Sequence, residues 1–114
     1  MKELYKQEIM ELTELLNEDE QWEDLKNILI EAKFDISTIA LVSFVEDDEE
    51  NEYGVIVSKD LKIHKYERKT QEGKNNIDNF IIVDITECKD ELDKYPQIAI
   101  AIDMIKNSEI LWKR

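Results

Sequence analysis

The first third of the chain places its apolar residues at helical spacing. Between residues 5 and 16 an apolar side chain recurs every three or four positions, which predicts a helix over residues 2–16 with one buried side. Asn17 followed by Glu20 has the pattern of a capping box, so a second helix should start there and extend to about Lys33. Two helices joined through one capping residue cannot run straight on, and we expect a helical hairpin or a sharply bent arm.

From Ser37 the spacing of apolar residues changes to alternation, and β-branched and aromatic residues become frequent. This pattern predicts four strands, over residues 38–45, 53–58, 61–69 and 80–85. The third strand should bury one face only, since its other face carries Lys62, His64, Tyr66 and Arg68. The fourth strand is almost continuously apolar, which indicates an interior position in the sheet or cover on both faces.

The end of the chain predicts one more helix. Pro96 suits a first helical turn, apolar residues follow at helical spacing, and Asn107 is a plausible stop. The tail, residues 108–114, is too apolar to remain in solvent and should pack against the rest of the domain. The expected fold is a single α+β domain over residues 1–114, in the order α-α-β-β-β-β-α. A four-stranded antiparallel meander with helices packed on one face is the simplest arrangement that buries these stripes.

The charge is large and unevenly placed. The 114 residues include 28 acids and 15 bases, for a net charge of −13. Residues 1–60 hold 18 acids and 5 bases, whereas residues 61–114 hold 10 of each. Such a surface repels phosphate backbones and anionic lipids, so we expect neither nucleic acid nor a membrane as partner. A basic protein is the partner that this charge favours.

The remaining composition points to the cytoplasm. Cys88 is the only cysteine and cannot form an internal disulfide, which favours a reducing compartment. The apolar stretches are too short to cross a bilayer, and we expect no signal peptide. Abundant Lys, Asn, Ile and Glu are typical of an AT-rich genome, such as that of a low-GC bacterium or its phage.

Metal, cofactor and catalytic chemistry find little support in the sequence. Cys88 and His64 are too few for structural zinc, and residues 47–54 lack the glycine and glutamate positions of a calcium loop. A Cys88–His64 couple is conceivable if the third and fourth strands pair, although a partly buried thiol and a histidine on a strand face are the simpler interpretation. We therefore predict no cofactor, no metal and no enzymatic activity.

Two acidic segments are the candidate partner-binding residues. The first is the connection between the first two strands, which could mimic phosphates, although a solvated acidic hairpin is the simpler interpretation. The second is the junction of the two helices. Its acids could also be no more than the solvent-exposed side of amphipathic helices. The candidate residues are Glu46, Asp47, Asp48, Glu49, Glu50 and Glu52 of the first segment, and Glu18, Asp19 and Glu20 of the second.

Three hypotheses for the function follow. The first is a non-enzymatic inhibitor of the immunity or antitoxin type, or a phage-encoded decoy, that neutralises a basic partner. The second is a self-associating structural or regulatory subunit that uses a sheet edge, the apolar tail or a basic stripe near the third strand. The third is a small-molecule binder or enzyme that uses His64, Tyr66 and Cys88.

Overall fold

The computed structural model describes residues 2–47, 51–69 and 80–110, and its elements follow the predicted α+β order. The helices are α1 (Lys2–Glu18), α2 (Glu23–Glu31), α3 (Lys89–Leu92) and α4 (Pro96–Lys106). Two 3₁₀ turns are η1 (Glu20–Trp22) and η2 (Ile36–Thr38). The strands are β1 (Ile39–Glu46), β2 (Asn51–Ser58), β3 (Ile63–Lys69) and β4 (Phe80–Asp84). The sequence had not predicted α3, which is a single turn.

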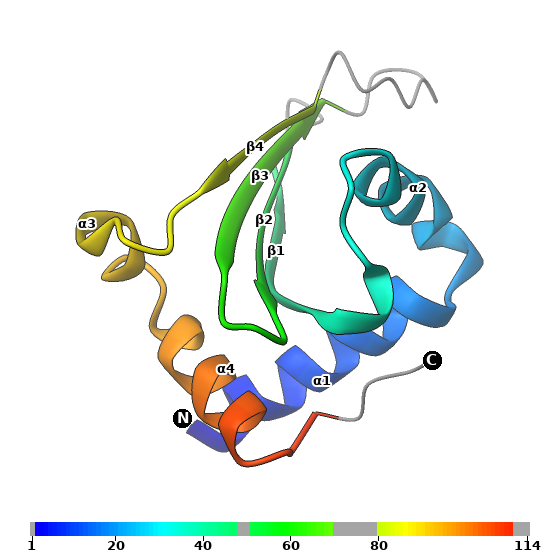
Figure 1. Cartoon of the computed structure of the whole chain (residues 1–114). Helices are drawn as coiled ribbons and strands as arrows, with labels where there is room; N and C mark the ends of the chain where they lie inside the picture. Colours follow the sequence, from blue (N-terminus) through cyan, green and yellow to red (C-terminus); the bar gives the residue numbers. More distant parts are fainter. Residues whose placement is uncertain (1, 48–50, 70–79, 111–114) are drawn as a thin grey trace.

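The strands form one curved antiparallel sheet in the order β1-β2-β3-β4 (Figure 1). A register shift between Leu41 and Ser43 adds one residue to β1 at that point. Such a bulge increases the local twist of a strand. The predicted meander is therefore confirmed, and β1 and β4 are its two edges.

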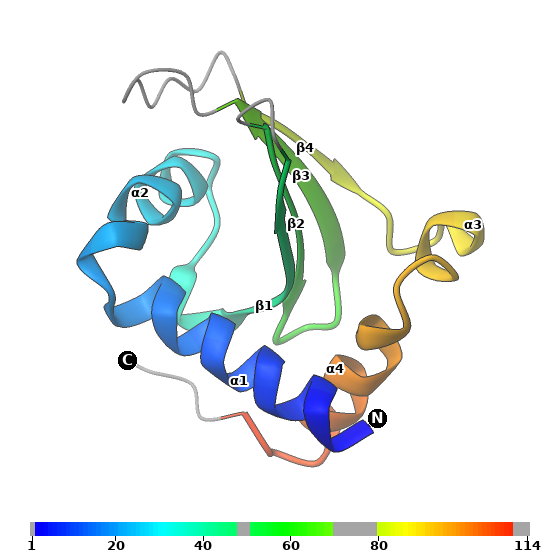
Figure 2. The same cartoon turned by 180° about the vertical axis from the view of Figure 1, so that it is seen from behind.

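Helices lie against both faces of the sheet, and the expectation of helices on one face was wrong. Successive residues of β1 point to opposite sides, because side chains alternate along a strand. Leu41 belongs to a core with Leu25 and Leu29 of α2, whereas Ala40 belongs to a second core with Met104 of α4. We call the two sides of the sheet the α2 face and the α4 face (Figures 1 and 2).

Helix α1 lies along the outer edge of β1 and contributes to both cores. Its residue Ile9 packs in the α4-side core, and Leu16 packs in the α2-side core. Ile110 is buried in the α4-side core, so this part of the expected docking of the tail is confirmed. Leu111 and Trp112 lie outside the described residues, as does the predicted loop over residues 70–78.

The turn between α1 and α2 differs from the predicted capping box. Helix α1 continues to Glu18, and the Asn17 side chain donates to the carbonyl oxygen of Thr13 at 2.9 Å within it. Asp19 is the residue that caps the next turn, since its Oδ1 accepts the N–H of Gln21 at 2.8 Å. The chain bends sharply there, so the bent arm is correct and the hairpin is not (Figure 1).

The outer edge of β1 is closed by α1. The N–H of Leu41 points away from β2 and donates to Oγ1 of Thr13 at 3.0 Å, in a buried contact. A buried N–H without an acceptor is costly, so this side-chain hydroxyl replaces the carbonyl of a further strand. The helix thereby protects this edge from pairing with another chain.

Replacing Thr13 by valine should lower the free energy of unfolding by about 1–3 kcal/mol, because the N–H of Leu41 would stay buried without an acceptor. Thr13→Ser keeps the hydroxyl and loses only a methyl group, so it should cost less than the valine variant. Urea unfolding followed by circular dichroism measures both changes. Wild-type stability of Thr13→Val would contradict this role for the hydroxyl.

Two predictions about strand burial were wrong. Strand β4 is an edge strand, not an interior one, and Ile81 and Val83 on its α4 face are 61% and 46% exposed. On β3, Tyr66 and Arg68 are buried, although that face had been expected to be exposed. The reason is that the α2 face is covered over most of its length, while the α4 face is left open beyond α4.

Candidate functional site

Acidic side chains cover the solvent side of the segment from α1 through η1 to α2. The opposite side of this segment packs into the two cores, so the remaining positions are free to be charged. We call this set the acidic helical surface: Glu3, Glu8, Glu11, Glu14, Glu18, Glu20, Glu23, Asp24 and Glu31, all exposed, with half-buried Asp19.

A shallow groove of about 460 Å³ lies within the acidic helical surface, lined by Glu11, Glu14, Leu15, Glu18 and Asp19. Two lysines of the same segment each make one polar contact. Lys6 Nζ lies 3.0 Å from Glu109 Oε1, and Lys26 Nζ lies 3.3 Å from the carbonyl oxygen of Asn17. Lys26 therefore lies beside the groove, at the end of α1, and the groove is negative because four of its five lining residues are acids.

The three helical candidates, Glu18, Asp19 and Glu20, lie together where α1 ends and η1 begins. Glu18 and Glu20 are exposed, whereas one carboxylate oxygen of Asp19 is used to cap η1. This junction therefore combines two surface charges with one carboxylate that also shapes the backbone.

The six candidates of the β1–β2 hairpin do not form one surface. Glu46 and Asp47 are exposed, and Asp47 accepts the N–H of Asn51 at 2.9 Å. Asp48, Glu49 and Glu50 lie outside the described residues. Glu52 is only 3% exposed and points into the α2 face, so this residue is not available to a partner.

Glu52 forms a buried ion pair with Arg68 across strands β2 and β3. The two residues are directly paired, with Arg68 Nε 3.1 Å from Glu52 Oε2 and the second guanidinium contact at 2.7 Å. Burial, with a contribution from the Glu52 carboxylate, raises the pKa of the neighbouring Tyr66. The Tyr66 hydroxyl beside the pair therefore stays protonated to a higher pH than that of an exposed tyrosine. An ion pair of this kind orients the strands and holds no exposed charge.

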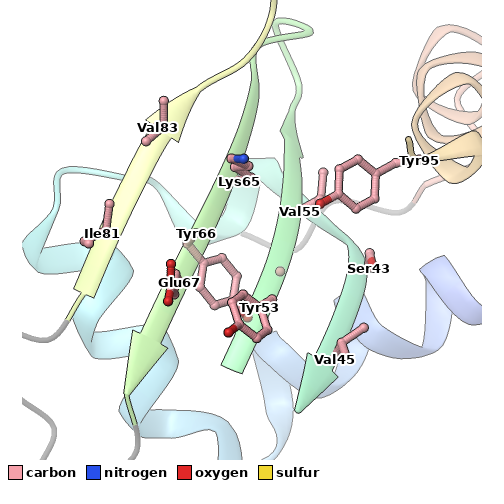
Figure 3. A pocket seen from close by; sticks show the side chains of 11 residues that line it. Ser43, Val45, Tyr53, Val55, Lys65, Tyr66, Glu67, Ile81, Val83 and Tyr95 are labelled. Carbon is pink, nitrogen blue, oxygen red and sulfur yellow. The ribbon is translucent and has the colours of Figure 1, made fainter. Parts of the chain in front are cut away.

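Part of the α4 face is not covered by α4, and we call this part the open sheet face (Figure 3). It forms a pocket of about 360 Å³ across all four strands. Its exposed apolar members are Val45, Tyr53, Ile81 and Val83. Tyr95, just before α4, bounds the pocket on one side, and Lys65 on β3 is bound by Glu91 of α3 at 2.9 Å. This patch had not been predicted, because alternation in a strand does not say whether each face is covered.

The residues of the small-molecule hypothesis lie in different places. His64 packs edge-on against Phe34 and lies 3.9 Å from Asp84 on the α2 face. Tyr66 lines the open-face pocket together with Gly54, whereas Cys88 is exposed in a separate groove at the start of α3. Hydrogen bonds from Thr86 hold the pKa of Asp84, in that same groove, below its usual range. The described geometry does not gather the three residues into one site.

Within the described residues, no group of three or more His, Cys, Asp and Glu side chains is arranged to hold a metal ion. The helices described here also include none that is long and apolar enough to span a bilayer.

The fold and surfaces together define an α+β protein with a curved four-stranded meander, an acidic helical surface and an open sheet face. No protein-family model matches the chain, and neither the curated proteins nor the solved structures include a match.

Proposed function

We propose that this protein is a non-enzymatic, cytoplasmic protein-binding module whose acidic helical surface binds a basic partner. The observation that carries the proposal is the arrangement of ten acids on one continuous segment, α1 through α2, with a groove among them. A concentrated negative field speeds the encounter with a basic protein and disfavours acidic ones. Inhibitors of the immunity or antitoxin type, and phage-encoded decoys, work on partners in this way.

The chemistry expected of the partner is a basic groove or ridge that normally meets phosphates. Carboxylates spaced along a helix can occupy such a surface, because each accepts charge-assisted hydrogen bonds from Arg or Lys. Leu15, which lines the groove among the acids, offers the partner an apolar contact in the middle of the charges. The combination fits a basic surface with an apolar centre.

Neutralising three acids of the acidic helical surface should weaken binding of the basic partner about tenfold. The test variant carries Glu14→Gln, Glu20→Gln and Glu23→Gln, at exposed positions. The partner is isolated from the native source on the immobilised protein at low salt, and its affinity is then measured by titration calorimetry. Raising the salt to about 1 M should abolish most of the binding, because the screening length falls to about 3 Å.

The control changes the same amount of charge elsewhere. Glu87→Gln, Asp90→Asn and Asp93→Asn also remove three exposed carboxylates, from the segment around α3. This variant should bind as the wild type does. Equal weakening by both variants, salt-independent binding, or a retained partner without excess basic charge would each refute the proposal.

A further inference from the structure

The open sheet face is made of two rows of side chains, each of which crosses all four strands. One row passes through Lys65 and the other through Glu67, both on β3 (Figure 3). Apart from these two residues and Ser43, the members of the rows are apolar or aromatic. A pocket of about 360 Å³ lies over the rows, which is within the size range of sites for small molecules. Its few polar groups therefore indicate which chemistry it accepts.

The charge of Lys65 is already matched. Its Nζ lies 2.9 Å from Oε2 of Glu91 on α3, and the side chain of Glu91 is largely buried by the contact. Glu91 also binds Lys94, which is 61% exposed and does not line the pocket. Lys65 is therefore held by the protein's own carboxylate and is a weak site for an anion.

Glu67 brings a half-buried carboxylate to the pocket without a cation beside it. Among the described residues it takes part in no ion pair, and Lys69, the next residue on this side of β3, is exposed to solvent. Glu67 is paired with Tyr53 on β2 and with Ile81 on β4. A carboxylate between an aromatic and an aliphatic side chain loses part of its hydration, so a cation that binds there compensates for the loss.

Tyr53 adds a second contact for a cation at the same place. The N–H of Ser58 donates to the carbonyl oxygen of Lys62 at 2.9 Å, and hydrogen-bonded and non-bonded pairs alternate along β2 and β3. Tyr53 and Glu67 are thus a non-bonded pair, with their Cα atoms about 4.5 Å apart and their side chains close together. An ammonium ion beside Glu67 can therefore also contact the face of the Tyr53 ring, which attracts cations.

Ser43 on β1 supplies a polar group at the other side of the pocket. The residue is only 9% exposed, its side chain lines the pocket, and it has no hydrogen-bond partner among the described residues (Figure 3). A buried hydroxyl usually has a partner, so this one is available to a ligand. Glu67 and Ser43 are two strands apart, at least about 10 Å across the sheet. A ligand that reaches both is longer than a single ring.

We propose that the open sheet face binds a small organic cation, an ammonium ion carried on a flat apolar body. The ammonium group lies between Glu67 and Tyr53, the body covers the apolar residues of the two rows, and a polar atom of the body meets Ser43. The net charge of −13 favours a cation over an anion at any surface of this protein, and Glu67 fixes its position in the pocket. The inference does not rest on the basic partner, because the acidic helical surface belongs to α1 through α2.

The probe is tryptamine, whose indole ring is flat and carries an N–H that can bond to Ser43. Titration followed by amide NMR signals should give saturable shifts at β2 and β3 around Tyr53 and Glu67. Tryptophol, which has a hydroxyl in place of the ammonium group, should bind about tenfold more weakly, and so should tryptamine to Glu67→Gln. Ser43→Ala should weaken tryptamine about threefold. Circular dichroism of each variant checks that the fold is kept.

The control variant carries Glu14→Gln, Glu20→Gln and Glu23→Gln, on the acidic helical surface. At about 0.15 M salt, where the screening length is about 8 Å, it should bind tryptamine as the wild type does. No saturable shift at the open sheet face up to about 10 mM tryptamine would overturn the proposal. Equal binding of tryptophol, or of tryptamine by Glu67→Gln, would overturn it too. Weakening in the control variant alone would place the cation on the acidic helical surface and refute this site, while leaving the proposed function untouched.

Discussion

Replacing Arg68 by methionine should lower the free energy of unfolding by about 3–5 kcal/mol, since it leaves the buried carboxylate of Glu52 without its cation. Glu52 is 3% exposed and cannot turn to water without opening the α2 face. Its carboxylate receives two contacts from the guanidinium, at 2.7 and 3.1 Å, which the thioether of methionine does not replace. Chemical unfolding at neutral pH, analysed as a two-state transition, gives the change.

The matched variant removes both charges. Glu52→Leu combined with Arg68→Met should recover most of the lost stability, because an apolar pair of similar size carries no desolvation cost. The comparison separates the cost of an unpaired buried charge from the value of the pair itself. If the double variant were as unstable as Arg68→Met alone, the loss would come from packing around position 68 and not from the carboxylate.

Replacing Gly54 by alanine should lower the free energy of unfolding by about 1–3 kcal/mol through overpacking. Gly54 is paired with Tyr66 across β2 and β3, and the Tyr66 ring lies over it. A Cβ added at position 54 would overlap the ring carbons and the hydroxyl of Tyr66. The ring is buried against Phe80 and has little room to move. Glycine is thus required here for space and not for an unusual backbone angle.

The overlap with Tyr66 is tested by removing the ring. In a Tyr66→Val background, Gly54→Ala should cost much less than in the wild type, which a double-mutant cycle of unfolding free energies measures. Additive losses would show that the methyl group disturbs something other than the tyrosine. Tyr66→Val alone gives the reference for the cycle.

Local pattern predicted most of the fold. The apolar stripe of α1, the alternation in β1 and β2 and Pro96 at the start of α4 each placed an element within about two residues. The pattern could not predict which element, if any, covers each face of the sheet. An apolar run such as that of β4 fits an interior strand and an open edge equally well, because its sequence does not record which strands flank it.

The candidate partner-binding residues could be predicted from the sequence only where a charged side chain is in fact exposed to solvent. This was the case for the acids of α1 and η1, because the apolar residues of this segment already indicate which side faces the solvent. It failed for Glu52, because the burial of one charge depends on a partner that lies 16 residues away, Arg68. The open sheet face was also missed, since it arises from what α4 does not cover.

Helix α1 packs into the cores on both sides of the sheet and so couples them. Ile9 is buried among residues of the α4 side and Leu16 among residues of the α2 side, on one continuous helix. Because a rigid helix cannot release one of these side chains without shifting the other, loosening of either core is transmitted to its counterpart. We therefore expect slow amide exchange to be shared by residues of both cores, with the same protection limit for each, as in a single cooperative unit.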